Sequence, residues 1–211
     1  MGHFGVYHVI KRECEAGHST ENYATETPQV FLSLNAHDVA LAQEVSDNGI
    51  VMLTDYFSHF IPRRNTGNHA NGTTPLHTLE DIPCSERLCQ ENAPITQIST
   101  LWPQVLNIIS DSSCDSATQT KKRVQFQNSF TIPDADGTEI TYELVGRVIH
   151  RTEHFTSQLR FGGKTFVYDD IKCASLVESD DPDLLVRPDT GCTYYVYHRK
   201  SEKAQVSLFS F

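Results

Sequence analysis

The sequence predicts an α+β fold in which antiparallel β-sheet dominates, and three observations predict it. Residues 139–149 alternate between two faces, which is the period of a half-buried strand. One face would hold Ile140, Tyr142, Leu144 and Val148, and the other Thr141, Glu143, Val145 and Arg147. Residues 154–160 and 164–168 are further strand-like runs around Gly162-Gly163, a hairpin signal. Apolar residues at helical spacing occur between residues 38 and 60.

The remaining segments fit the same fold class. Residues 4–34 are predicted to be β-structure, 95–109 a β-rich stretch interrupted by Pro103, and 193–197 a closing strand. A first helix is predicted from a cap at Asp38 to a stop at Asp47-Asn48-Gly49, and a second helix over 50–60, ended by Pro62. Two polar stretches without periodicity are predicted loops, an insertion over 63–82 and a shorter loop over 110–120.

Composition narrows the classes of function. The 211 residues suffice for one domain with a core, or for two small subdomains that share one. The formal net charge of −10 makes nucleic acid a poor partner, and the single basic run, Lys121-Lys122-Arg123, is interpreted as a solvated strand end. We expect no membrane span, because no stretch approaches the roughly 20 apolar residues required. Since Met1-Gly2-His3-Phe4 does not resemble a signal peptide, a cytosolic or nuclear location is expected.

The six cysteines are expected to be reduced. An even count would suggest disulfides in a secreted protein, but in a reducing compartment clustered cysteines more often bind a metal or lie free in a core. Cys14 and His18 lie four positions apart in one turn-like stretch, and Cys84 and Cys89 lie five apart in another. Together they would supply three thiolates and one imidazole, a closed tetrahedral set typical of structural zinc. The alternative is that they are unrelated residues in two loops.

A histidine and an aspartate are predicted to meet on the hairpin. If a four-residue connection spans Arg160 to Gly163, then Leu159 faces Lys164, and His154 falls directly opposite Asp169. Opposed residues have Cβ atoms about 5 Å apart on one face, within reach of a contact between a carboxylate and an imidazole. Such a pair is the general-base half of a Cys–His–Asp relay, although a chance juxtaposition would look the same.

These segments resemble the histidine box of the ubiquitin-specific proteases. The resemblance rests on a Tyr-x-Leu strand with a following histidine, a catalytic-histidine segment, an aromatic-Asp-Asp segment and a tyrosine-rich last strand. Here they read Tyr142-Glu143-Leu144 with His150, His154-Phe155-Thr156-Ser157, Phe166-Val167-Tyr168-Asp169-Asp170 and Thr193-Tyr194-Tyr195-Val196-Tyr197. Upstream, Cys14–His18 and Cys84–Cys89 are similar to that family's two zinc knuckles, and Leu101-Trp102-Pro103 begins a segment like the strand after the second.

The resemblance covers nearly the whole chain and implies part of a papain-like cysteine protease fold. By analogy, about 4–110 would be the zinc-finger-like fingers with part of the palm, and about 120–211 the rest of the palm. His154 would take the proton from a cysteine thiol that attacks the carbonyl at the C-terminus of ubiquitin, Asp169 would orient His154, and Asp170 would assist through polar contacts. A structural zinc would lie on Cys14, His18, Cys84 and Cys89.

Three departures from the family pattern matter. No segment resembles the family's cysteine box or its thumb, so the chain alone is expected to be inactive. Glu153 replaces the glycine that usually precedes the histidine, and it could crowd the channel for the substrate's glycine tail. His18 replaces a usual cysteine, which zinc tolerates.

Three functional hypotheses follow. The first is the C-terminal part of a cysteine-type deubiquitinase. The second is a non-catalytic module that binds ubiquitin or a ubiquitinated protein, or acts as a scaffold, on the same palm and fingers. The third is an unrelated zinc-stabilised, β-rich interaction protein. Without the thumb, a partner or a dimer would be expected to cover the exposed face of the palm.

Overall fold

The computed structural model describes residues 5–23, 29–34, 39, 49–60, 82–109, 123–134, 137–169, 171–187, 189 and 191–200. The predicted insertion over 63–82 therefore lies outside the described residues except for Ile82, and the predicted loop over 110–120 lies wholly outside them. Of the helix predicted from Asp38 to Gly49, only Val39 and Gly49 are described. Val39 is helical and buried.

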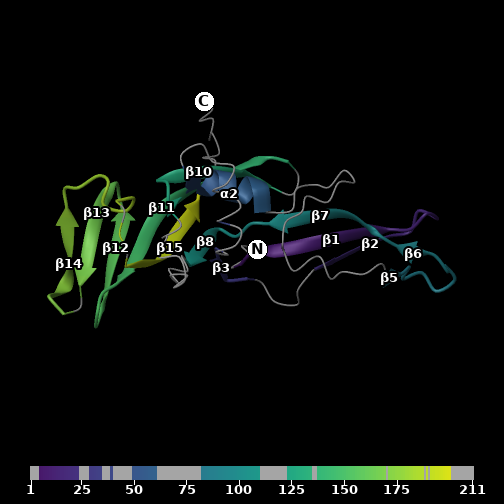
Figure 1. The fold of residues 1–211 in the computed structure, drawn as a ribbon, viewed down its shortest axis with the longest axis horizontal. Coiled ribbons are helices and arrows are strands. Elements are labelled where there is room, and N and C mark those ends of the chain that lie inside the picture. The colour runs from purple at the N-terminus through teal and green to yellow at the C-terminus, as the bar shows by residue number, and fades with distance from the viewer. Residues whose placement is uncertain are drawn as a thin grey trace, which may run out of the picture.

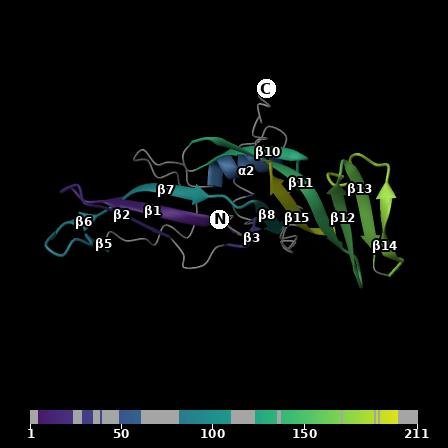
Figure 2. The same cartoon turned by 180° about the vertical axis from the view of Figure 1, so that it is seen from behind.

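The described residues form an elongated, mostly β-sheet molecule (Figures 1 and 2). Its main element is an eight-stranded sheet in which β14, β13, β12, β11, β15, β8 and β3 follow one another and β10 also pairs with β11. The strands are β3 (Phe31–Ser33), β8 (Val105–Ile109), β10 (Ser129–Pro133), β11 (Glu139–His150), β12 (Phe155–Phe161), β13 (Lys164–Asp169), β14 (Cys173–Ser179) and β15 (Cys192–Arg199). All of its pairings are antiparallel except that of β3 with β8.

A second, three-stranded sheet extends away from the first. Its order is β2-β1-β7, with β1 at Tyr7–Glu13, β2 at Ser19–Tyr23 and β7 at Ile95–Leu101. A two-stranded ribbon of β5 (Ile82–Pro83) and β6 (Asn92–Ala93) lies at its far end, opposite to the end of the molecule that carries β14 (Figure 1). The break predicted at Pro103 is confirmed, because β7 ends and β8 begins on either side of it.

The segment predicted as a helix over 50–60 is helical only in part. Ile50–Met52 forms the short strand β4, which pairs in parallel with β9 (Arg123–Gln125), and helix α2 spans Leu53–Phe60. The apolar run is ambiguous by pattern, and a strand partner more than 70 positions away decides it. Within the described part of the chain, no helix is long and apolar enough to cross a membrane.

A bulge in β11 corrects the predicted faces of this strand. Its pairing with β15 shifts by one residue between Leu144 and Gly146, and a one-residue insertion moves every later side chain to the opposite face. Arg147 and Ile149 are therefore buried, at 2% and 0% exposure, whereas Val148 is only partly buried. The sequence pattern had placed Val148 with the core residues and Arg147 on the other face.

One hydrophobic core lies between the large sheet and the elements that cover it. Leu144, Tyr142 and Tyr197 are fully buried on the sheet, and Phe57 of α2 packs against Phe130 and Trp102 at ring-centroid distances of 5.3 and 5.7 Å. The buried Tyr142 hydroxyl donates a hydrogen bond to the Pro103 carbonyl. The core therefore joins α2 to the sheet and to the segment between β7 and β8.

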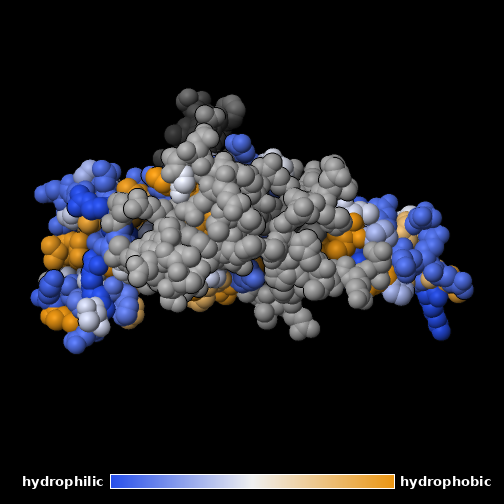
Figure 3. All heavy atoms as spheres, viewed as in Figure 1, coloured by the Kyte–Doolittle hydropathy of each residue, from blue (hydrophilic) through white to orange (hydrophobic). Residues whose placement is uncertain are grey.

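The opposite face of β12 and the outer strand β14 expose apolar side chains. The exposed members are Phe155, Leu159, Phe161, Leu176 and Val177. In the space-filling view this end of the molecule carries hydrophobic side chains among hydrophilic ones (Figure 3).

Truncating the core should separate buried from exposed leucines. Leu144→Ala is expected to lower the free energy of unfolding by about 2–5 kcal/mol, because it removes packed methyl groups and leaves a cavity. The matched control, Leu176→Ala on the exposed face of β14, should change it by no more than about 0.5 kcal/mol. Urea unfolding followed by the fluorescence of the single, buried Trp102 measures both. Equal losses would contradict the described core.

Candidate functional site

Two groups of chemically active side chains lie far apart in the molecule. The first begins at the turn between β1 and β2. Gly17 there has φ of +83°, a conformation that favours glycine, and its N–H donates to the Cys14 carbonyl at 2.9 Å. The Cys14 N–H donates in turn to the His18 carbonyl at 3.1 Å. This tight turn brings the Cys14 thiol and the His18 ring together, with Sγ and Nδ1 3.5 Å apart.

The second half of this group lies between β5 and β6. The Cys84 N–H donates to the Glu91 carbonyl and the Cys89 N–H to the Glu86 carbonyl, both at 2.9 Å. The two turns are tied together, since the Glu91 carboxylate accepts the Ala16 N–H at 2.8 Å. Residues 75 positions apart in the sequence are thus held side by side.

The four predicted metal ligands are brought together by these turns. Their ligand atoms all lie within 4.8 Å of one another. Cys14 Sγ is 3.8 Å from Cys89 Sγ, and Cys84 Sγ is 3.7 Å from His18 Nδ1. With Zn–S bonds of about 2.3 Å, the edges of a tetrahedral site measure about 3.8 Å between sulfurs and slightly less between sulfur and nitrogen. The cluster therefore fits one tetrahedral metal ion, with all four positions supplied by the protein.

The thiols in this cluster influence one another's ionisation. Burial opposes ionisation of Cys14, but backbone contacts at His18 and Ala16 and the thiols of Cys84 and Cys89 together lower its pKa. The backbone at Glu91 favours the Cys89 thiolate, yet burial and the neighbouring sulfurs raise the pKa of Cys89 to about 11. A divalent cation would offset this repulsion, and its binding would release protons.

The second group lies on the β12–β13 hairpin, and its register differs from the prediction. Phe161 pairs with Lys164, so the turn contains only Gly162 and Gly163 instead of four residues. Their φ angles of +58° and +80° are those of a type I′ turn, whose twist matches the strands. Asp169 consequently pairs with Thr156, and His154 lies just before β12, which begins at Phe155.

His154 nevertheless contacts Asp169. A register shift of two residues keeps a side chain on the same face of the sheet, and the imidazole Nε2 lies 3.5 Å from Oδ2 of Asp169. This is an ion-pair distance, longer than an ordinary N–H···O hydrogen bond. The predicted contact is thus present, and the catalytic role of either residue stays a prediction.

The two oxygens of the Asp169 carboxylate have different partners. Oδ1 accepts the backbone N–H groups of Ile171 and Lys172, at 3.1 and 3.2 Å. Oδ2 faces His154 and, at 3.6 Å, the Lys172 ammonium. The backbone contacts fix the carboxylate in the tight turn before β14, and the second oxygen remains directed at the imidazole.

Asp169 is built to stay ionised. Burial, at 8% exposure, opposes its charge, but the backbone N–H groups of Lys172 and Ile171 and the electrostatic contacts with His154 and Lys172 outweigh it and lower its pKa. An ionised carboxylate beside Nε2 favours the tautomer that carries the proton there. Nδ1 is then the basic nitrogen of His154.

Of two further residues considered for this site, the structure describes Glu153 but not Asp170. Asp170 lies outside the described residues, so its predicted role stays a prediction. Glu153 is exposed, immediately before His154 in a bend of the chain. Its predicted effect on a substrate channel is likewise a prediction.

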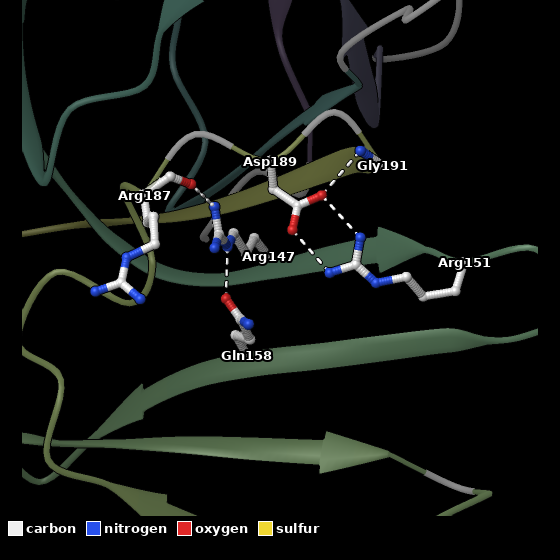
Figure 4. Close-up of polar contacts among 6 residues, drawn as sticks. All are labelled: Arg147, Arg151, Gln158, Arg187, Asp189 and Gly191. Carbon is white, nitrogen blue, oxygen red and sulfur yellow. Dashed lines mark hydrogen bonds and ion pairs between the residues drawn. The ribbon is translucent and has the colours of Figure 1, made fainter.

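A polar network that joins β11, and the residue just after it, to the segment before β15 was missed by the sequence analysis (Figure 4). Buried Arg147 donates to the Gln158 side chain at 2.6 Å and to the Arg187 carbonyl at 2.5 Å. Arg151 donates to both carboxylate oxygens of Asp189, at 3.0 and 2.8 Å. Asp189-Thr190-Gly191 is an Asx-turn pattern that the sequence could have signalled, whereas the burial of Arg147 depends on the bulge in β11.

Comparison with known proteins identifies similar folds only at the level of structure. No family model matches the sequence, and no curated protein does. Among solved structures, a chain of the SAGA Ubp8/Sgf11/Sus1/Sgf73 DUB module bound to ubiquitin aldehyde matches with TM-score 0.51 and 16% identity. The match covers 94% of this chain and 42% of that one. The same module with a Ubp8 variant bound to monoubiquitin gives TM-score 0.50 and 16% identity, over 94% and 41%.

A third neighbour is the Pan2 pseudoubiquitin hydrolase–RNA exonuclease module of Saccharomyces cerevisiae, at TM-score 0.45 and 14% identity, covering 93% of this chain and 32% of that one. The chain thus spans less than half the length of the solved chains that it matches. Its fold is similar to that found in deubiquitinase modules.

The paired turns should bind one metal ion per chain. Cobalt(II) added to metal-free protein is expected to give the intense visible bands of a tetrahedral site with thiolate ligands, because three thiols and one imidazole lie within 4.8 Å of one another. Cys84→Ser should weaken binding at least about tenfold by removing one thiolate. Cys173→Ser on β14, in the other sheet, is the matched control and should bind normally. Octahedral cobalt spectra, or equal loss in both variants, would contradict a four-ligand site.

The ionised state of Asp169 should make stability fall in acid. Because folding lowers its pKa, the carboxylate contributes stability that is complete above its unfolded pKa, about 3.9, and is lost as pH falls through the lower folded pKa. Asp169→Asn should therefore lower the melting temperature at pH 7 and flatten its decline below about pH 4. The control is Asp183→Asn, because Asp183 is an exposed acid in the segment between β14 and β15. It should leave the melting temperature and its decline in acid unchanged. An unaltered acid profile in Asp169→Asn would contradict this assignment.

Proposed function

We propose that this chain is the C-terminal, histidine-bearing part of a ubiquitin-specific protease-like domain, which binds ubiquitin and presents His154 as the base of a cysteine relay. The observation that carries the proposal is the contact of His154 Nε2 with Asp169 Oδ2 at 3.5 Å. It is supported by the likeness of the fold to ubiquitin-bound DUB modules. The paired metal cluster is consistent with it.

In this proposal, the chain's own residues take part in the chemistry only by accepting a proton. Asp169 holds the imidazole with Nε2 toward the carboxylate, so that Nδ1 is left to accept the proton of a thiol. Asp170 would add polar contacts at the end of β13. The thiol would attack the carbonyl at the C-terminus of ubiquitin, and the 211 residues contain no segment that resembles the cysteine box which carries it.

The metal cluster has a structural part in this proposal. Zinc is the ion we assign to Cys14, His18, Cys84 and Cys89, since three thiolates and one imidazole suit it and no position is left for water. It would hold the tips of the β1–β2 hairpin and the β5–β6 ribbon together, as fingers extending from the large sheet. The three-stranded sheet would then be a fixed surface for one side of ubiquitin.

A second candidate function is a module that binds ubiquitin or a ubiquitinated protein without cleaving it. Exposed Glu153, directly before His154, favours this candidate, because a carboxylate there would obstruct the glycine tail of a substrate. The apolar side chains Phe155, Leu159 and Phe161 on the open face of β12 favour it as well, since a partner or a second copy would cover them. The net charge of −10 would suit a basic partner.

A titration with ubiquitin tests the proposal. Isotope-labelled chain loaded with zinc should show NMR shifts near His154 and along the three-stranded sheet. Ubiquitin shortened at its glycine-containing tail should lose only the shifts near His154. Complete absence of shifts up to about 1 mM ubiquitin, where binding is worth only about 4 kcal/mol, would refute both candidate functions.

A hydrolysis assay followed by a comparison of ubiquitin binding separates the two candidates. The 211-residue chain should not cleave a ubiquitin–fluorophore substrate, because no nucleophile is assigned in it. Turnover that His154→Ala abolishes would show that the chain supplies its own thiol. Cys173, whose Cα pairs with that of Asp169, would be the first cysteine to replace. If binding occurs without turnover, Glu153→Gly should strengthen binding of ubiquitin with an intact tail in the first candidate and leave it unchanged in the second.

A further inference from the structure

The turn that carries His154 is tied to a distant segment of the chain. Between β11 and β12 the chain reverses over residues 151–154, and the Arg151 N–H donates to the His154 carbonyl at 2.8 Å. The side chain of the same Arg151 extends to Asp189, 38 positions away, and forms a bidentate pair with it. The backbone of Arg151 therefore closes the turn that carries His154, and the side chain of Arg151 ties this turn to Asp189.

Asp189 is itself held in place. Its Oδ1 also accepts the Gly191 N–H at 2.9 Å (Figure 4). The Gly191 carbonyl accepts the His150 N–H at 2.7 Å. Asp189 is only 16% exposed in its side chain. The hydrogen bonds from Arg151 lower its pKa most, with smaller help from the Gly191 N–H and from the charge of Arg147, against the effect of burial.

The backbone of His150 approaches Gly191 so closely that a side chain would not fit there. A Cβ at this position would lie 2.4 Å from the His150 carbonyl oxygen and 3.2 Å from the Arg151 guanidinium. Only glycine therefore fits at this position, and its hydrogen bonds link the end of β11 to the Asp189 carboxylate. The segment that leads into β15 is also held by buried Arg147, which donates to the Arg187 carbonyl, and by fully buried Leu185.

We propose that Arg151 and Asp189 are a positioning pair for His154: their bidentate contact ties the 151–154 turn to the entry of β15 and so keeps the imidazole directed at Asp169. The role assigned to the imidazole rests on the proposed function, but the positioning effect belongs to the free chain. A fork of two parallel N–H···O bonds restricts orientation as well as distance, which a single ion pair does not. Arg151 and Asp189 do not themselves contact a reacting atom in this proposal.

The test uses the full chain without ubiquitin, loaded with zinc, and compares Arg151→Gln with Arg187→Gln. Arg187 is the matched control because its side chain pairs with Asp181 at 2.7 Å in the same connecting segment, while its contact to Arg147 uses only the backbone. Two signals are followed. One is the nitrogen–proton spectrum of the His154 ring, identified among ten histidines by its loss in His154→Gln. The other is hydrogen exchange of the amide at position 151.

The wild-type ring is expected to show one tautomer, with the proton on Nε2. Arg151→Gln should give the averaged spectrum of an untethered imidazole and should speed exchange of the amide at 151 about tenfold, the equivalent of about 1.4 kcal/mol. The Leu144 amide, which donates to the Asn128 carbonyl in the core, should exchange as before. Arg187→Gln should reproduce the wild type in both signals and in the Leu144 control amide.

Two milder variants keep the test decisive if Arg151→Gln does not fold. Arg151→Lys keeps the charge but not the fork. Asp189→Asn keeps the oxygen that accepts from both Arg151 and the Gly191 N–H, but replaces Oδ2, the second acceptor of the fork, with an amide nitrogen. Each should give a His154 spectrum between those of the wild type and an untethered ring. A His154 ring and an amide at 151 that behave alike in wild type, Arg151→Lys, Asp189→Asn and Arg187→Gln would overturn the proposal. Since no ubiquitin is present, that result would leave the proposed ubiquitin binding to its own titration.

Discussion

Strand β11 is hydrogen-bonded to three other strands, β10, β12 and β15, and the positions of the other parts depend on this pairing. Its first half carries the fully buried Tyr142 and Leu144. A bulge then reverses which side chains are buried, so that Arg147 and Ile149 face the covered side in the second half of β11. Since Ile149 pairs with Thr156 and Thr156 pairs with Asp169, the face chosen on β11 also decides where the carboxylate points.

The polar groups on this face are satisfied within the protein. Among the described residues, no buried side-chain nitrogen or oxygen lacks a hydrogen-bond partner. Arg147 uses a side-chain amide and a backbone carbonyl, and Asp169 uses two backbone N–H groups. Desolvating a charge is costly unless such partners are present, which explains why the buried charges of Arg147 and Asp169 have hydrogen-bond partners within the protein. A fixed surrounding is also what orients a catalytic imidazole.

The metal cluster follows a different design. Its ligands come from two turns, and the strands that flank the second turn, β5 and β6, contain only two residues each. Little apolar surface is available there, and Leu88 between two ligands is 96% exposed. Backbone hydrogen bonds and the contact from Ala16 to Glu91 bring the ligands together, and a bound metal would supply cohesion that packing does not.

The sequence by itself determined the strand-rich class, the hairpin at Gly162-Gly163, the break at Pro103 and the two pairs of candidate ligands, because each of these follows from local pattern or spacing. The register of the hairpin also depends on local residues, but only the φ angles of Gly162 and Gly163 show that the turn contains two residues. Only the tertiary structure decided that Ile50–Met52 is a strand, that β11 is bulged, and that Arg151 reaches Asp189. These features depend on partners between 38 and more than 70 positions away, and no local periodicity records which distant backbone or side chain a residue will meet.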